Sequence, residues 1–139
     1  MHYVVYASKR PETTSDIDVD NIIRLAEKYN TLSDITGILL VKNGYFLQYL
    51  EGNKNPVTNL LEKLKSDVRH NDLLILSEGE IQERVFPEWR MAPIHHTTDH
   101  SAFSARINNT QQLKLKHTLN KYFIQESPIS FAYSEKMFS

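Results

Sequence analysis

Residues 35–52, ITGILLVKNGYFLQYLEG, contain two apolar runs on either side of the dipeptide Asn43-Gly44. An Asn-Gly pair between β-branched and aromatic residues is a strong signal for a β-hairpin. The first arm is almost entirely apolar, which favours a strand in the middle of a sheet. The stretch therefore predicts two neighbouring strands at the centre of the fold.

Further helices and strands flank this hairpin. Helical periodicity and strand composition mark five segments, namely helices at residues 15–34 and 55–70 and strands at 2–8, 73–81 and 84–93. Apart from the last strand, which Pro87 interrupts, the order is β-α-β-β-α-β. This order predicts an α+β, ferredoxin-like fold, in which two helices cover one face of an antiparallel sheet.

The character of the sequence changes after Pro93. A polar stretch is followed by an amphipathic helix at residues 110–125, whose apolar side chains are Leu113, Leu115, Leu119, Tyr122 and Phe123. An uncovered sheet face would expose a large apolar patch. We therefore predict two units: a domain of residues 1–95, and a C-terminal helical extension of residues 96–139 that caps the free face.

The composition is that of an ordinary globular protein. The chain has 139 residues, of which 40% are hydrophobic and 24% charged, and this length suffices to bury one core. The net charge of −1 provides no broad cationic field, so a nucleic-acid partner is not favoured. The longest apolar run, residues 38–41, is too short to cross a membrane, and no signal-peptide core follows Met1. We expect a cytoplasmic location, and a homo-oligomer remains open.

The sequence offers no motif for enzymatic or metal chemistry. It has no cysteine, so thiolate ligands, disulfides and a cysteine nucleophile are excluded. His95, His96 and His100 cluster, but their spacing matches no zinc signature and favours a polar surface loop. None of the four glycines forms a phosphate-binding loop, and the carboxylates occur in caps and turns. We therefore expect no enzyme activity and no metal site.

Gln48 is the unexpected residue of the hairpin. Side chains alternate faces along a strand, so Gln48 shares its face with Phe46 and Leu50. A buried amide without hydrogen-bond partners costs a few kcal/mol. Either this face is solvated, or a group inside the protein binds the amide.

One binding function fits the same order of elements. RNA-recognition domains also use the β-α-β-β-α-β order and stack bases on strand aromatics. Residues 41–50, VKNGYFLQYL, resemble their third-strand motif, but Phe46 occupies the position of its small residue. An RNA-binding module is therefore the alternative function. The net charge of −1 does not favour it, because RNA-binding proteins usually present a basic surface.

Four stretches of the sequence resemble the BLUF family of blue-light sensors, which use FAD. They are YVVYAS at residues 3–8, YNTLSDITGILLVKNGYFLQYLEG at 29–52, DVRH at 67–70 and RVFPEWRM at 84–91. The resemblance extends over residues 1–93 and includes every predicted element in order, whereas the family varies beyond them. An accidental match of all four stretches is improbable, so the signature is specific.

The resemblance assigns a role to Gln48. In the family the flavin ring lies between the two helices, over the sheet, and the matching positions make Tyr6 and Gln48 the photoactive pair. An amide has one acceptor and two donors, so Gln48 can bridge a phenol and a flavin in two hydrogen-bond arrangements. The resemblance implies that light drives an electron from Tyr6 and a proton through Gln48. The amide is left rotated or tautomerised, absorption shifts to the red, and darkness restores the first state.

Other positions match the flavin contacts of the family, namely Ile22, Asn30, Phe46, Asp67, Arg69 and His70. The resemblance implies that Ile22 and Phe46 pack around the ring and that Asn30 pairs with its carbonyl edge. It places His70 at the flavin edge and includes Asp67 among the cofactor-binding positions without a specific contact. It places Arg69 on the phosphates, where a guanidinium suits paired oxygens. Simpler interpretations stay open: Asn30 as a helix C-cap, Ile22 as plain core and Arg69 as a surface charge.

Trp89 and Met91 match the element that relays the change in the family. The resemblance does not decide which of the two faces the flavin in darkness. No effector domain is recognisable in the sequence. The expected output is therefore a change in the C-terminal helices or in binding to a separate, unidentified partner protein.

Overall fold

The computed structural model describes residues 1–42, 44–66, 71–94 and 100–137. Its elements follow one another as β1 His2–Lys9, α1 Asp16–Ser33, β2 Thr36–Lys42, β3 Tyr45–Gly52, α2 Lys54–Ser66, β4 Asn71–Glu80, β5 Arg90–Ile94, α3 His100–Asn108, α4 Leu113–Leu119, the π-helix η1 Asn120–Ile124 and α5 Ile129–Met137. The predicted order of helices and strands is confirmed.

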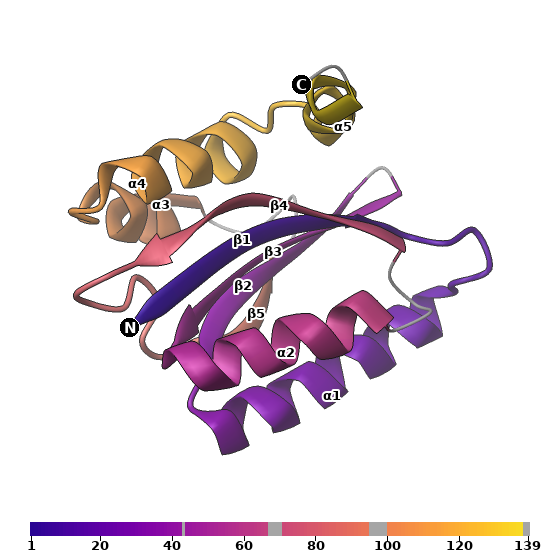
Figure 1. Cartoon of the computed structure of the whole chain (residues 1–139), viewed down its shortest axis with the longest axis horizontal. Coiled ribbons are helices and arrows are strands. Elements are labelled where there is room, and N and C mark those ends of the chain that lie inside the picture. Colours follow the sequence, from indigo (N-terminus) through magenta and orange to yellow (C-terminus); the bar gives the residue numbers. More distant parts are fainter. Residues whose placement is uncertain (43, 67–70, 95–99, 138–139) are drawn as a thin grey trace.

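The five strands form one sheet in the order β4-β1-β3-β2-β5 (Figure 1). The strands β1 to β4 pair antiparallel, as the ferredoxin-like prediction requires. The edge strand β5 differs, because it pairs parallel to β2. It is also shorter than predicted: residues 84–89 form no strand, and Pro87 among them lacks the amide hydrogen that a ladder needs.

Both ends of α1 have a local cause. At its start the Ser15 hydroxyl accepts a hydrogen bond from Asp18 N at 3.1 Å, and the Asp18 carboxylate accepts one from Ser15 N at 2.9 Å. This reciprocal capping box satisfies two backbone donors. At its end Asp34 adopts the left-handed conformation with φ 54°, and its N–H donates to Asn30 O. The chain then turns at once into β2.

Two glycines serve the β2–β3 hairpin. Gly44 in its turn has a φ of 81°, which glycine adopts without strain. At Gly37 a Cβ atom would collide with the carbonyl oxygen of Tyr49 on the neighbouring strand. The predicted hairpin is thus confirmed, although Asn43 lies outside the described residues.

The helices α1 and α2 cover one face of the sheet, here called the helix face (Figure 1). Apolar side chains from both layers form its core: Val4, Tyr6, Leu39, Phe46 and Leu50 from the strands, Val19 and Ile22 from α1, Ile35 after α1, and Val57, Leu60 and Leu61 from α2. The inward residues of α2 recur at the spacing of three to four residues that places side chains on one side of a helix.

The opposite face, here called the cap face, is covered by the C-terminal helices (Figure 1). Its core combines Tyr3, Val5, Leu47 and Tyr49 of the sheet with Ile107, Leu115, Leu119, Tyr122 and Phe123 of the cap. The predicted cap is confirmed, but Leu113, one of the apolar side chains of its amphipathic helix, does not belong to the inward face, since it is 77% exposed. Leu113 and Leu115 lie about 200° apart around a helix and cannot share a face.

Candidate functional site

Tyr6 and Gln48 face each other across two neighbouring strands. They are paired residues of β1 and β3, so their Cβ atoms lie about 5 Å apart on one face. Both are buried on the helix face, where Tyr6 packs with Phe46 and Leu50. The phenol oxygen Oη and the amide oxygen Oε1 are shielded from solvent. The interpretation that Gln48 lies on a solvated face is therefore wrong.

The side chains of Tyr6 and Gln48 have complementary hydrogen-bonding capacity. A phenol both donates and accepts, whereas an amide offers two donors on nitrogen and one acceptor oxygen. Because both groups are enclosed, water competes little for their bonds, and each bond is stronger than in solvent. A polar ligand on the helix face can therefore be bound by Gln48 in either of two amide orientations.

Asn30 brings a second buried amide to this layer. Its side chain is fully buried at the end of α1, and Nδ2 donates to the Arg90 carbonyl oxygen at 3.4 Å. Its oxygen Oδ1 is buried and accepts no hydrogen bond from any residue that the structure describes. An unsatisfied buried acceptor costs about 1–3 kcal/mol, so this atom fits a ligand that offers an N–H, as a flavin ring does. The C-cap interpretation of Asn30 is wrong, because the cap residue is Asp34.

The two apolar positions predicted around the ring, Ile22 and Phe46, both lie in the helix-face core. Phe46 is fully buried on β3, and Ile22 on α1 is 6% exposed. The structure thus gathers them with Tyr6 into one cluster. Ordinary core packing accounts for both side chains, so their contact with a flavin stays a prediction.

Several predicted positions lie outside the described residues. They are Asp67, Arg69 and His70 after α2, together with His95 and His96. The side chains of Met91 and His100 also lie outside the described part. The roles assigned to these residues stay predictions.

Trp89 packs on the cap face, away from Tyr6 and Gln48. It precedes β5 instead of lying within it, which corrects the prediction that the last strand carries it. Its ring stacks on Phe86 with 5.0 Å between centroids, and the guanidinium of Arg106 in α3 lies 5.5 Å from its ring centroid. Trp89 therefore connects the sheet to the cap, while its part in signalling stays a prediction.

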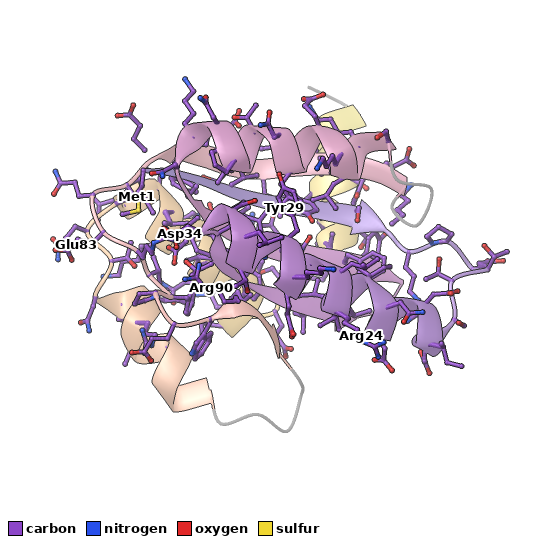
Figure 2. All side chains as sticks on the ribbon, turned by 90° about the horizontal axis from the view of Figure 1, so that it is seen from below. Met1, Arg24, Tyr29, Asp34, Glu83 and Arg90 are labelled. Carbon is purple, nitrogen blue, oxygen red and sulfur yellow. The ribbon has the colours of Figure 1, made fainter. Side chains whose placement is uncertain are left out.

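A charged cluster that the sequence analysis missed ties α1 to the chain near β5. The Asp34 carboxylate pairs with Arg90 at 2.9 Å and with Arg84 at 3.1 Å, and Figure 2 shows Asp34 beside Arg90. The hydrogen bond from Arg90, and next the charge of Arg84, lower the pKa of Asp34 below its ordinary value. No local pattern signals this cluster, because its partners are at least 50 residues apart.

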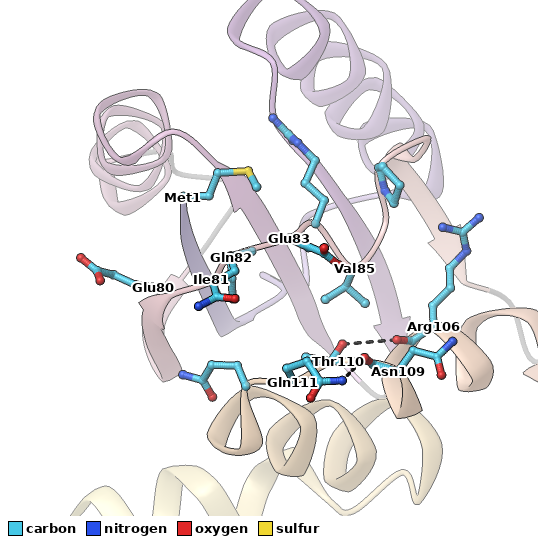
Figure 3. Close-up of a pocket in the computed structure, with 13 residues that line it drawn as sticks. Met1, Glu80, Ile81, Gln82, Glu83, Val85, Arg106, Asn109, Thr110 and Gln111 are labelled. Carbon is cyan, nitrogen blue, oxygen red and sulfur yellow. Dashed lines mark hydrogen bonds between the residues drawn. The ribbon is translucent and has the colours of Figure 1, made fainter.

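A cavity of about 990 Å³ lies between the β4–β5 connection and the α3–α4 turn (Figure 3). Its lining includes Gln82, Arg84 and Val85 on one side and Arg106 and Thr110 on the other. Among the described positions that are predicted to bind flavin, none lines it. The cavity is therefore separate from the Tyr6–Gln48 site.

Two other kinds of site find no support in the described part of the chain. Its residues include no group of three or more His, Cys, Asp or Glu side chains that could hold a metal ion. No described helix is long and apolar enough to cross a membrane.

Comparison with known proteins gives one consistent family. A family model described as sensors of blue light using FAD matches residues 1–92. The photoactivated adenylate cyclase subunit beta of Euglena gracilis is 39% identical over 89 residues, which are 63% of this chain and 10% of that protein. The chain thus spans about a tenth of the length of this curated relative.

Solved structures agree with this match. The photo-activated state of BlsA has a TM-score of 0.70 and 30% identity, covering 88% of this chain and 94% of BlsA. A bacterial light-regulated adenylyl cyclase has a TM-score of 0.71 and 30% identity, covering 97% of this chain and 36% of the cyclase. The chain belongs to the BLUF family of blue-light sensors.

Proposed function

We propose that this chain binds FAD between α1 and α2, over the helix face, and senses blue light through Tyr6 and Gln48. The observation that carries the proposal is the buried cross-strand pair of a phenol and an amide. The phenol and the amide together offer donors and acceptors to a polar ring bound on this face. The open acceptor of Asn30 and the family of the chain both favour a flavin as that group.

The chemistry of the pair follows from its two side chains. When bound, FAD would supply the absorption of blue light and the acceptor for an electron. Tyr6 is the electron source, and a phenol that loses an electron also releases its proton, which the amide oxygen of Gln48 accepts. When electron and proton return, Gln48 holds its hydrogen bonds in the second arrangement. No covalent bond is lost, so darkness restores the first arrangement.

The output of this switch is a change in binding to an effector protein. Membership in a family of sensors agrees with the expectation that residues 1–92 catalyse no reaction of their own. Relatives named as photoactivated adenylate cyclases contain far more chain than the part matched here. We propose that the cap helices present the surface that the effector reads, since they cover the face opposite the flavin site.

The light-minus-dark absorption spectrum of the FAD-loaded chain tests the proposal. We expect a flavin spectrum that shifts reversibly to the red under blue light. Titration with FMN, which has the same ring but lacks the adenylate, should give weaker binding than FAD if Arg69 contacts the phosphates. A colourless protein that binds RNA would instead favour the RNA-binding alternative, which the family match does not support.

Replacing Asn30 should weaken flavin binding. In Asn30→Ala the buried acceptor Oδ1 is lost, and one hydrogen bond contributes about 0.5–1.5 kcal/mol. We therefore expect up to about a tenfold rise in the Kd for FAD, measured by titrating apoprotein and following flavin fluorescence.

The matched control is Asn21→Ala, because Asn21 lies on the same helix and is exposed. It should leave the Kd for FAD unchanged. If Asn30→Ala lowers thermal stability but binds FAD as tightly as the unmodified chain, Asn30 only supports the fold.

A further inference from the structure

Glu51 is a fully buried carboxylate on the cap face of β3. Its Oε1 accepts hydrogen bonds from Tyr49 Oη at 2.7 Å and Val85 N at 2.6 Å. Its Oε2 accepts from Thr36 Oγ1 at 2.7 Å and Phe86 N at 2.8 Å. Acidic side chains are almost never fully buried unless such partners compensate them.

All four partners donate, which fits an ionised carboxylate. The two backbone groups can only donate, and the Thr36 hydroxyl accepts from Arg84 at 2.9 Å, which directs its own hydrogen to Glu51. Burial, and next the charge of Glu51, raise the pKa of Tyr49 well above its ordinary value, so the phenol keeps the hydrogen that it donates. The same Arg84 guanidinium donates to the Glu51 backbone oxygen at 3.2 Å and brings a positive charge close to the carboxylate.

The bonds to Glu51 hold the middle of the segment at residues 81–89. This segment joins β4 to β5 without forming a helix or a strand. Its ends bond to neighbouring backbone, with Ile81 N donating to Met1 O at 3.0 Å and Gly37 N donating to Trp89 O at 2.7 Å. It also lines the cavity shared with the α3–α4 turn, which leaves it without close packing on that side (Figure 3). The Glu51 carboxylate therefore fixes the backbone at Val85 and Phe86 against β3.

Phe86 in turn contacts Trp89, whose backbone oxygen also accepts a hydrogen bond from Gly37 N of β2. Trp89 N donates to Phe86 O at 3.2 Å, and the two rings stack with 17° between their planes. Arg106 of α3 lies over the Trp89 ring and 3.8 Å from the Glu88 carboxylate. A change in the hydrogen bond between Glu51 and Phe86 N should therefore also change the contact between the Trp89 ring and Arg106 of the cap.

We propose that Glu51 is a positioning residue, which couples the strand of Gln48 to Trp89 and, through Trp89, to α3. Gln48 and Tyr49 are consecutive and their side chains point to opposite faces, so a displacement of β3 at Gln48 also moves Tyr49 and Glu51. The predicted response to light rests on the proposed function, because light acts at Gln48. The predicted effect of Glu51 on the position of Trp89 in darkness is independent of the proposed function.

The variant Glu51→Gln tests this coupling in the FAD-loaded chain. An amide of equal size keeps one acceptor oxygen but presents an N–H₂ group to one of the two backbone donors, Val85 N or Phe86 N, so the hold on residues 85–86 weakens. Trp89 is the only tryptophan of the chain, so its indole N–H gives a single peak in a ¹H–¹⁵N spectrum. We expect this peak to be displaced in darkness, and exchange of the Val85 and Phe86 amides to accelerate by about tenfold or more.

Two further variants complete the design. Tyr49→Phe removes one of the donors to Glu51 and keeps the ring. It should displace the indole peak in the same direction as Glu51→Gln, by a smaller amount. If Glu51→Gln does not fold, Tyr49→Phe replaces it as the test. Glu78→Gln is the matched control, since Glu78 is an exposed acid on β4, and it should leave the peak in place.

Under blue light we expect the flavin shift to persist in Glu51→Gln while the light-induced displacement of the indole peak is lost. An indole peak and amide exchange equal to those of the unmodified chain, in Glu51→Gln and Tyr49→Phe alike, would overturn the proposal. If the unmodified chain shows no flavin response to light, the proposed function fails. The dark spectra then still decide whether Glu51 holds Trp89.

Discussion

In the variant Gln48→Leu we expect FAD to stay bound and the light-induced red shift to disappear. Leucine has nearly the volume of glutamine and suits the apolar neighbours Phe46 and Leu50, so the helix-face core should remain packed. The substitution removes the acceptor and both donors of the amide. Loss of the shift should therefore be complete, and one light-minus-dark absorption spectrum measures it.

Tyr6→Phe removes the other half of the pair and should have the same effect. The ring that packs in the helix-face core survives, while the hydroxyl that supplies electron and proton is absent. The matched control is Tyr3→Phe, because Tyr3 is an equally buried tyrosine of β1 whose side chain lies on the cap face and bonds Ser77 at 2.8 Å. Tyr3→Phe should respond to light normally.

Leu39→Met provides a second control at the site itself. Leu39 pairs with Gln48 from the neighbouring strand β2, and methionine changes its shape while keeping its volume and apolar character. We expect the red shift to remain in this variant. A red shift of ordinary size in Gln48→Leu would show that the amide takes no part in the photocycle.

The elements and the alternation of faces were predictable because local patterns determine them. The Asn43-Gly44 turn, the apolar arms and the helical periods of residues 15–34 and 55–70 specify the hairpin and its two covering helices. A period of two places Gln48 on the face of Phe46, and the structure confirms the helix-face position of Phe46. The predicted pairing of Tyr6 with Gln48 came from family resemblance, and the strand register agrees with it.

The partners of Glu51 could not be predicted, because they arise from segments far apart in the chain. Its donors come from β2, β3 and the 81–89 segment, and an acid in the sequence LEG ordinarily belongs on the surface. One signal was available: Glu51 shares its face with Tyr49 in a strand whose other residues, apart from Gln48, are apolar, aromatic or glycine. The parallel pairing of β5 with β2 is likewise a long-range feature that no local pattern encodes.

Shortening one buried side chain of the cap should cost much of the stability of the chain. Leu119 of α4 is fully buried between the cap and the sheet. Leu119→Ala removes its apolar contacts and leaves a cavity, which typically lowers the free energy of unfolding by roughly 2–5 kcal/mol. Since domains are stable by only about 5–15 kcal/mol, this is a large fraction. Urea unfolding of the FAD-loaded variant in darkness measures it.

The matched control for Leu119→Ala is Leu113→Ala on the same helix. Leu113 is 77% exposed, so its truncation should change the free energy of unfolding by less than about 0.5 kcal/mol. The red shift should persist in both variants, because Tyr6 and Gln48 lie on the other face of the sheet. Equal stability of the two variants would contradict the packing of the cap on the sheet. The proposal that the cap helices present the effector surface would then lose its basis.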